Sequence, residues 1–239
     1  MKSAIIIPAR LKSSRLKKKL LIEVKGKTIL QYTIENALTS QVAERVIVAT
    51  EDQEIKRHVD SLGYKVDCIK TPQFNSGTER VKHIALEHLS DYSKIINLQA
   101  DEPLLKGSSL DQMFNAITKE INISSAYEIL SDEESYKSEN VVKVTLNTFD
   151  MALYFSRSPI PFGCQNGLYH AFRHIGIYGF HTEALTDLPS TGMYQKAENL
   201  EQLAWLEAGY NIKMIRINYK TIGIDTQDNI NELKEYLDS

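Results

Sequence analysis

The sequence predicts an α/β fold with a mixed, mostly parallel sheet. Apolar runs of strand length at 4–7, 45–49 and 94–98 alternate with segments at 29–38, 55–62 and 78–89 whose apolar residues recur at helical spacing. The first run is continuously apolar and ends in Pro8, as expected of a strand covered on both faces. This alternation is typical of βαβ units and therefore of a parallel sheet in the first half of the chain.

A cationic loop follows the first predicted strand. It contains Arg10, Arg15 and a lysine cluster that ends at Lys19. Ligands of open α/β sheets bind beyond the carboxyl ends of the strands, and arginine and lysine neutralise phosphate oxygens. The stretch contains neither GxxxxGK[ST] nor GxGxxG, so a different phosphate-binding design is required. We predict that these three residues contact a triphosphate; a solvated basic loop is the alternative.

The helix predicted over 78–89 begins directly after Ser76 and Gly77. Its apolar residues form one stripe, and the Thr78 hydroxyl is expected to cap its first turn. Backbone N–H groups at a helix N-terminus lack partners within the helix and favour an anionic ligand. Ser76 and Gly77 are therefore candidate ligand-binding residues.

The second half of the chain changes character after a polar segment at 130–140. Strand patterns follow at 141–146, 152–155, 175–180 and 212–217, with a helix pattern over 197–208. The chain has no Gly/Ser/Pro-rich linker. We predict one domain over residues 1–239 with a smaller sub-lobe from roughly 130 to 190. The loop at 162–172 is the candidate mobile or dimer-contacting segment.

Two aspartates are candidate metal ligands. Asp101 follows the strand at 94–98, and Asp225 lies in the segment Gly223-Ile224-Asp225-Thr226. Mg²⁺ binds one or two carboxylates and completes its coordination with water and substrate phosphates, so this pair would suffice. The alternatives are an ordinary turn at Asp101 and an N-cap of the last helix at Asp225-Thr226.

The second half also holds polar residues that give no joint signal by themselves. His170 and His174 have the spacing of zinc ligands on a helix, but their segment resembles a loop entering a strand, so zinc is not favoured. The full set is Arg157, His174, Tyr178, Glu201 and Gln202.

Composition excludes several classes of protein. The chain has 239 residues and a net charge of −3, which gives no sign of a nucleic-acid surface. Cys68 and Cys164 show no CxxC spacing, and no apolar run reaches the roughly 20 residues of a membrane span. We expect a cytoplasmic protein that binds neither nucleic acid nor membrane.

These residues and motifs resemble the 3-deoxy-manno-octulosonate (Kdo) cytidylyltransferases almost from end to end. The resemblance implies a nucleotide-diphospho-sugar transferase fold, usually in a homodimer, that activates Kdo with CTP and Mg²⁺ for lipopolysaccharide biosynthesis. The segments that carry it include Ile6-Ile7-Pro8-Ala9-Arg10, Ser76-Gly77-Thr78-Glu79-Arg80, Gln99-Ala100-Asp101-Glu102-Pro103, Ala152-Leu153-Tyr154-Phe155-Ser156-Arg157, Leu200-Glu201-Gln202-Leu203 and Gly223-Ile224-Asp225-Thr226.

The resemblance also implies roles for individual residues. Arg15 and Lys19 would hold the triphosphate and take part in catalysis, together with the Mg²⁺ ligands Asp101 and Asp225. Ala9, Arg10, Ser76 and Gly77 would lie near the nucleotide. Gln99 is assigned to both the nucleotide and the sugar. The remaining sugar-binding residues would be Arg157, His174, Tyr178, Glu201 and Gln202.

Several positions depart from the family pattern. Ala100 replaces a common glycine and Leu20 a common proline, while Ala204 stands where an arginine is frequent and Gln195 near the place of an acidic residue. The alternatives are CTP-dependent activation of another sugar acid, such as 8-amino-Kdo or a nonulosonic acid, and a non-catalytic nucleotide-binding homologue.

Overall fold

The computed structural model describes residues 2–13, 16–164 and 171–238. The chain divides into two compact units, one formed by residues 1–114 and 219–239 and the other by residues 115–218. The sub-lobe expected from roughly 130 to 190 lies within the range of the second unit. Arg15 and most of the loop at 162–172 lie outside the described residues.

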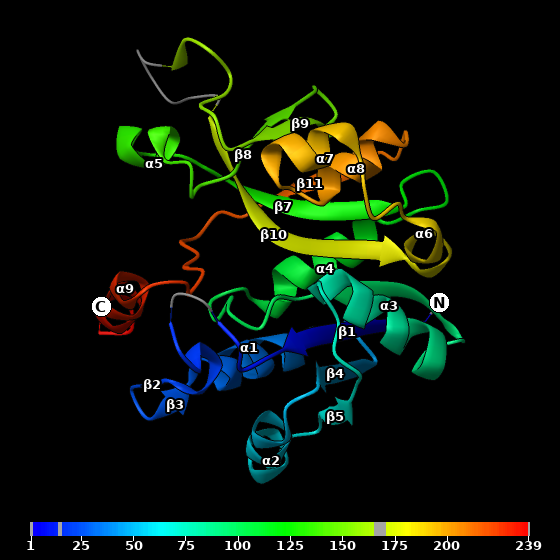
Figure 1. Cartoon of the computed structure of the whole chain (residues 1–239), viewed down its shortest axis with the longest axis vertical. Helices are drawn as coiled ribbons and strands as arrows, with labels where there is room; N and C mark the ends of the chain where they lie inside the picture. Colours follow the sequence, from blue (N-terminus) through cyan, green and yellow to red (C-terminus); the bar gives the residue numbers. More distant parts are fainter. Residues whose placement is uncertain (1, 14–15, 165–170, 239) are drawn as a thin grey trace. The chain divides into compact units, whose positions relative to one another are not determined.

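The first unit contains a parallel sheet with the strand order β6-β1-β4-β5. The strands are β1 (Lys2–Ala9), β4 (Arg45–Thr50), β5 (Asp67–Lys70) and β6 (Tyr92–Asn97). Ile6 of β1 pairs with Ile47 of β4 and with Asn97 of β6. Figure 1 shows β4 between β1 and β5. The parallel sheet predicted for the first half is confirmed.

Three helices connect these strands: α1 (Ile29–Leu38), α2 (Gln53–Ser61) and α3 (Gly77–His88). Two more follow in the chain, α4 (Gly107–Ala116) after β6 and α9 (Gln227–Tyr236) at the carboxyl-terminal end of the element order. A 3₁₀ turn, η1 (Lys19–Leu21), and a small hairpin, β2 (Glu23–Val24) with β3 (Lys27–Thr28), lie between β1 and α1. The predicted helix at 29–38 is confirmed residue for residue. The isoleucines of β1 are fully buried, which explains why that strand is continuously apolar.

The start of α3 differs in one detail from the prediction. Ser76, not Thr78, is the N-cap, and its hydroxyl accepts a hydrogen bond from the N–H of Glu79 at 3.1 Å. The helix begins one residue earlier than expected, so Thr78 lies inside its first turn. The predicted apolar stripe is confirmed, because Val81, Ile84 and Leu89 are fully buried. The last helix is capped by Thr226 in a capping box with Asn229, as the alternative interpretation of that segment expected.

The second unit has a mixed sheet with the strand order β11-β7-β10-β8-β9. Only β11 and β7 pair in parallel among these neighbours; the other pairs are antiparallel. The strands are β7 (Ile123–Ile129), β8 (Lys143–Leu146), β9 (Ala152–Ser156), β10 (Phe172–His181) and β11 (Ile212–Arg216). The helices are α5 (Glu133–Lys137), α6 (Thr182–Asp187), α7 (Met193–Glu198) and α8 (Gln202–Glu207).

The single helix predicted over 197–208 is wrong. The structure has α7 and α8 there, separated by Asn199, whose backbone is left-handed with a φ of 55°. The N–H of Asn199 donates to the carbonyl of Gln195 and closes α7. Asparagine adopts the left-handed conformation more readily than most residues, so it can end a helix. The apolar residues on either side keep helical spacing, which is why the pattern predicted one continuous helix.

No helix in the described part of the chain combines the length and the apolar character needed to cross a membrane.

Candidate active site

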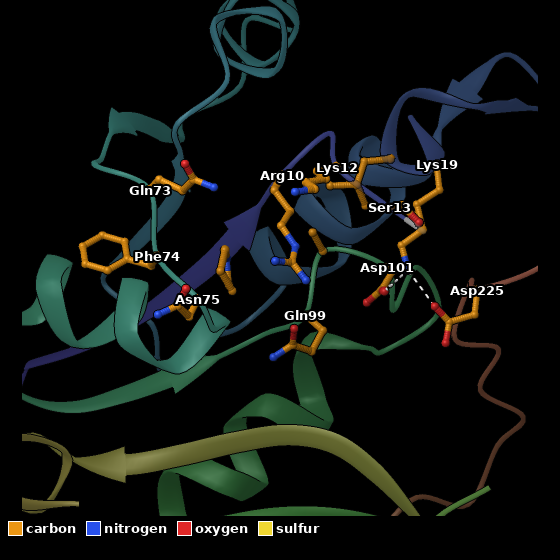
Figure 2. Close-up of a pocket in the computed structure, with 13 residues that line it drawn as sticks. Arg10, Lys12, Ser13, Lys19, Gln73, Phe74, Asn75, Gln99, Asp101 and Asp225 are labelled. Carbon is orange, nitrogen blue, oxygen red and sulfur yellow. Dashed lines mark hydrogen bonds and ion pairs between the residues drawn. The ribbon is translucent and has the colours of Figure 1, made fainter. Parts of the chain in front are cut away.

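A pocket of about 460 Å³ lies at the carboxyl end of the parallel sheet in the first unit (Figure 2). Its lining comes from the end of β1 and the loop after it, from the loop before α3, from the residues after β6, and from Asp225. Five of the predicted site residues line it: Arg10, Lys19, Gln99, Asp101 and Asp225. Residues separated by more than two hundred positions therefore meet in one cavity, as the strand-end argument predicted.

Lys19 binds both candidate metal ligands. Its Nζ donates to Oδ2 of Asp101 at 2.5 Å and to Oδ1 of Asp225 at 2.9 Å, drawn as dashed lines in Figure 2. A third hydrogen bond, of 2.8 Å, reaches the carbonyl of Ile224. Burial lowers the pKa of Lys19, but attraction to Asp101 and the hydrogen bonds to both carboxylates outweigh it, so the pKa is raised. The ammonium group is therefore charged at neutral pH.

The described residues include no group of three or more His, Cys, Asp or Glu side chains that could hold a metal ion. The donor set is instead a pair of carboxylates around one cation. This composition fits Mg²⁺, which takes one or two protein carboxylates beside substrate phosphates, and it does not fit an ion that needs a cage of protein ligands.

A smaller cavity of about 80 Å³ is lined by residues of both the β1 end and the start of α3. Ser76 and Gly77, both predicted, contribute to it, together with Arg10 and Gln99. A Cβ on Gly77 would lie 3.3 Å from Cγ of Pro8 and 3.6 Å from Oε1 of Gln99. Glycine therefore allows the helix N-terminus to approach the strand end closely.

Arg80 fixes the backbone at the end of β1. Its side chain is buried, and Nη1 donates to the carbonyl of Ala9 at 2.9 Å while Nη2 pairs with Glu51. Burial lowers the pKa of Arg80, although Glu51 opposes that shift. The Ala9 side chain is itself fully buried and lines neither cavity. Ala9 thus meets the site through its backbone, which Arg80 holds in place.

The structure brings together part of the polar set that gave no joint signal in the sequence. In the second unit, the rings of His174 and Tyr178 have centroids 5.6 Å apart, and Tyr178 packs edge to face on Trp205 at 4.8 Å. His174 and Tyr178 are both buried. Burial and the neighbouring Glu201 raise the pKa of Tyr178 well above its ordinary value, so the phenol is protonated.

Gln202 and Arg157 belong to the same unit but have different surroundings. Gln202 is 2% exposed, and its buried Nε2 has no hydrogen-bond partner among the described residues. Arg157 is held by backbone carbonyls, with Nε donating to Glu198 at 3.2 Å and Nη1 to Glu139 at 2.9 Å. A buried amide without a hydrogen-bond partner lowers the stability of the fold. Gln202 is therefore the residue of this set that would gain most from a hydrogen bond to a ligand.

Sequence reasoning missed other residues that line the larger pocket. Gln73, Phe74 and Asn75 form the loop before Ser76, and Lys12 and Ser13 follow Arg10 (Figure 2). Gln73, Phe74 and Asn75 directly precede the predicted helix N-terminus, and this position in the sequence could have identified them as pocket residues. Leu20 and Ala100, noted as departures from the family pattern, also line this pocket.

An open parallel sheet with a cationic pocket and two carboxylates at its strand ends defines a nucleotide-binding α/β protein. A family model described as cytidylyltransferase matches residues 4–217. The 3-deoxy-manno-octulosonate cytidylyltransferase of Fusobacterium nucleatum is 34% identical over 241 residues, covering 99% of this chain and 97% of that protein. The namesake from Porphyromonas gingivalis is 37% identical over 250 residues, covering 98% and 96%.

Solved structures agree with these matches. The structure of CMP:2-keto-3-deoxy-manno-octonic acid synthetase complexed with CTP has a TM-score of 0.90 at 31% identity, covering 100% of this chain and 99% of that one. The 4-diphosphocytidyl-2C-methyl-D-erythritol synthase of Anaerococcus prevotii, at 14% identity and a TM-score of 0.69, shares the fold. The chain belongs to the 3-deoxy-manno-octulosonate cytidylyltransferase family.

Proposed function

We propose that the protein transfers the cytidylyl group of CTP to Kdo, giving CMP-Kdo and pyrophosphate. The observation that carries this proposal is the pocket at the strand ends, where Arg10, Lys19 and two aspartates converge in a chain of this family. The cations match a triphosphate, and the aspartates match the metal that accompanies it. The CMP:2-keto-3-deoxy-manno-octonic acid synthetase structure, which has a TM-score of 0.90 to this chain, was determined with CTP.

In the reaction, the anomeric hydroxyl of Kdo attacks the α-phosphorus of CTP. The new bond joins the sugar oxygen to the α-phosphorus, the bond from that phosphorus to its bridging oxygen breaks, and the hydroxyl proton is released. Phosphoryl transfer requires little covalent work from a protein, so positioning and charge neutralisation dominate. No serine or cysteine nucleophile is required.

The chain's own residues supply positioning and charge. Arg10 and Lys19 would bind phosphate oxygens, Arg15 is proposed to join them, and Ser76, Gly77, Gln99 and the Ala9 backbone would surround the nucleoside. Asp101 and Asp225 would hold Mg²⁺. When bound, Mg²⁺ neutralises charge on the phosphates.

The second unit would bind the sugar acid. Its buried polar groups suit a ligand rich in hydroxyls, because such a ligand can satisfy the Nε2 atom of Gln202. The proposed sugar-binding residues of this unit are Arg157, His174, Tyr178, Glu201 and Gln202. We further propose that the protein is a homodimer, acts in the cytoplasm and supplies lipopolysaccharide biosynthesis.

A different sugar acid is the second candidate. Gln195 stands near the place of a family carboxylate, and its Oε1 is buried without a hydrogen-bond partner among the described residues. The Oε1 atom of Gln195 can accept a hydrogen bond from a donor group of such an acid, as in 8-amino-Kdo.

The experiment is pyrophosphate release from CTP and Mg²⁺, with no acid, with Kdo, with 8-amino-Kdo or with a nonulosonic acid. Mass spectrometry of the trapped product identifies the nucleotide sugar. We expect release that depends on Kdo, with the mass of CMP-Kdo. Preference for another acid in direct competition would replace Kdo as the substrate. CTP binding without release, across the whole panel, would indicate a non-catalytic homologue.

A further inference from the structure

Ser125 contacts the imidazole of His174 inside the second unit. Ser125 is fully buried on β7, and its Oγ lies 2.9 Å from Nε2 of His174 on the neighbouring strand β10. The same Oγ lies 2.8 Å from the carbonyl oxygen of Ile177. Ser125 therefore connects a ring nitrogen to a backbone carbonyl of the strand that carries the ring.

The hydrogen count settles the direction of both bonds. A carbonyl oxygen has no hydrogen, so the contact with Ile177 requires the hydroxyl hydrogen of Ser125. A serine hydroxyl has only that one hydrogen to donate, so its oxygen must accept from the ring. Nε2 of His174 is consequently protonated. In the neutral imidazole, Nδ1 is then an acceptor with a free lone pair.

A bulge in β10 creates this arrangement. Ile175 pairs with Ala126 and Tyr178 pairs with Ser125. Gly176 and Ile177 are therefore two extra residues in β10, with no partner between the consecutive β7 residues Ser125 and Ala126. In an uninterrupted strand, residues four apart are separated by about 13 Å, whereas the rings of His174 and Tyr178 have centroids 5.6 Å apart. Ser125 binds the carbonyl of a bulge residue and thereby ties the ring orientation to the bulge.

His174 is held as a neutral ring. Burial, with a smaller contribution from the charge of Arg173, lowers the pKa of His174 to about 3. Phe155 packs against one side of the ring with centroids 4.8 Å apart. Among the described residues, none forms a hydrogen bond with Nδ1, and 8% of the residue's surface remains accessible. A neutral acceptor of this kind pairs with a hydroxyl donor and cannot serve as a cationic partner for a carboxylate.

We propose that Ser125 is a positioning residue that fixes the Nε2–H tautomer of His174, so that Nδ1 accepts a hydrogen bond from a hydroxyl group of the sugar acid. The proposal rests on the proposed function, because it names the contact made by a residue assigned to that sugar site. Ser125 itself touches neither the sugar nor the reacting atoms. It acts through the ring that it orients.

The test compares the wild type with Ser125→Ala, Ser125→Thr and Ser124→Ala. Ser124 is a fully buried serine of the same strand, and its side chain lies on the opposite face of the sheet, so it is the matched control. Nitrogen-15 NMR of histidine-labelled protein reports the tautomer of His174, whose signal is identified by its loss in His174→Gln. Steady-state kinetics give kcat and the KM for Kdo and for CTP separately.

We expect the wild type and Ser124→Ala to show a protonated Nε2. Ser125→Ala should populate both tautomers and raise the KM for Kdo roughly three- to tenfold, with kcat and the KM for CTP unchanged. Ser125→Thr, which retains a hydroxyl, should restore the wild-type tautomer and KM. A protonated Nδ1 in the wild type would overturn the proposal, and so would a shifted tautomer in Ser125→Ala with an unaltered KM for Kdo.

Failure of the proposed function is recognised separately. If the wild type releases no pyrophosphate with any sugar acid, the function fails while the NMR signal still reports whether Ser125 fixes the tautomer. If Ser125→Ala does not fold, the wild-type tautomer and the kinetics of Ser125→Thr decide. A folded Ser125→Thr protein with a mixed tautomer would contradict the proposal.

Discussion

Nζ of Lys19 lies 2.5 Å from Oδ2 of Asp101 and at the same time binds Asp225. The lysine side chain is 13% exposed and the Asp101 side chain 29% exposed, so this ion pair is only partly screened by water. One ammonium group thus binds both carboxylates that are proposed to hold Mg²⁺ and offsets one of their two negative charges. Lys19 stabilises this like-charged pair when no other cation is bound.

Replacing Lys19 by methionine should separate its effect on metal binding from its effect on turnover. Without the ammonium group, Asp101 and Asp225 lose the cation that they share and that competes with a metal ion, so Mn²⁺ used as a probe for Mg²⁺ should bind the CTP-free variant more tightly than it binds the wild type. Turnover with CTP should nevertheless fall roughly a hundredfold or more, because the triphosphate loses a fixed cation. Electron paramagnetic resonance measures free Mn²⁺, and pyrophosphate release measures turnover.

Lys18→Met is the matched control for that variant. Lys18 precedes Lys19 but pairs with Glu54 at the surface and does not line the pocket. The Lys18→Met variant should bind Mn²⁺ and turn over substrate at close to wild-type levels. Equal Mn²⁺ affinity of wild type and Lys19→Met would refute the idea that Lys19 competes with the metal.

Asp101→Asn tests the carboxylate side of the same contact. The amide keeps the shape of the side chain but loses the charge that binds Lys19 and is proposed to bind Mg²⁺. We expect a loss of about 3 kcal/mol of transition-state stabilisation, which is roughly a hundredfold in kcat/KM. The melting temperature should change little, because the Asp101 side chain is partly exposed and lies outside the core. Near-normal turnover of the folded variant would remove Asp101 from its proposed role.

Arg80→Met should act on the shape of the nucleotide site through the backbone of Ala9. The substitution breaks a buried pair with Glu51 and removes the hydrogen bond to the Ala9 carbonyl. We expect destabilisation by about 3 kcal/mol in urea unfolding, and a higher KM for CTP. The exposed Arg57→Met should stay within about 0.5 kcal/mol of wild type.

A double variant identifies which contact matters. Adding Glu51→Gln to Arg80→Met removes the carboxylate that the first change left without its cation. Stability should partly recover if the ion pair dominates, whereas the KM for CTP should stay high because the Ala9 carbonyl remains without its donor. Recovery of both quantities would show that Arg80 does not position the strand end.

The fold of the first unit was predictable because local and tertiary signals agree there. The isoleucines of β1 are apolar without interruption since both faces of the strand are covered, and α1 has an apolar face of the expected period. Asp101 and Asp225 were found because strand ends and helix starts are readable in a sequence. Residues such as Phe74 and Asn75 were missed because a loop gives no periodic signal.

The second unit was harder to predict for two physical reasons. Asn199 ends α7 within a helical apolar pattern, because one left-handed residue breaks a helix without altering the spacing of its neighbours. His174 and Tyr178 approach each other through a bulge that inserts two residues, and an insertion of two leaves the alternation of strand residues in phase. Their assignment to one site therefore depended on the family resemblance alone.

His174 should make the stability of the fold sensitive to mild acid. Its pKa is lowered to about 3 in the folded protein, first by burial and then by Arg173, while in the unfolded chain the pKa is near the ordinary value of 6.5. The unfolded state therefore binds the extra proton between these values. The free energy of unfolding contributed by this residue is fully present above the unfolded pKa and decreases as the pH falls from about 6.5 towards 3.

The expected size of the effect is about 2 kcal/mol between about pH 7 and about pH 5, from a slope of roughly 1.4 kcal/mol per pH unit. Urea unfolding of wild type and His174→Gln at several pH values measures it. The variant has no titrating ring, so its unfolding free energy should fall less steeply over this range, and the difference between the two proteins should shrink with acid. His88→Gln changes an exposed histidine of α3 and should follow the wild-type curve. Parallel curves for wild type and His174→Gln would mean that the ring is protonated in the folded protein as readily as in the unfolded chain, and the neutral acceptor inferred for the sugar site would then be wrong.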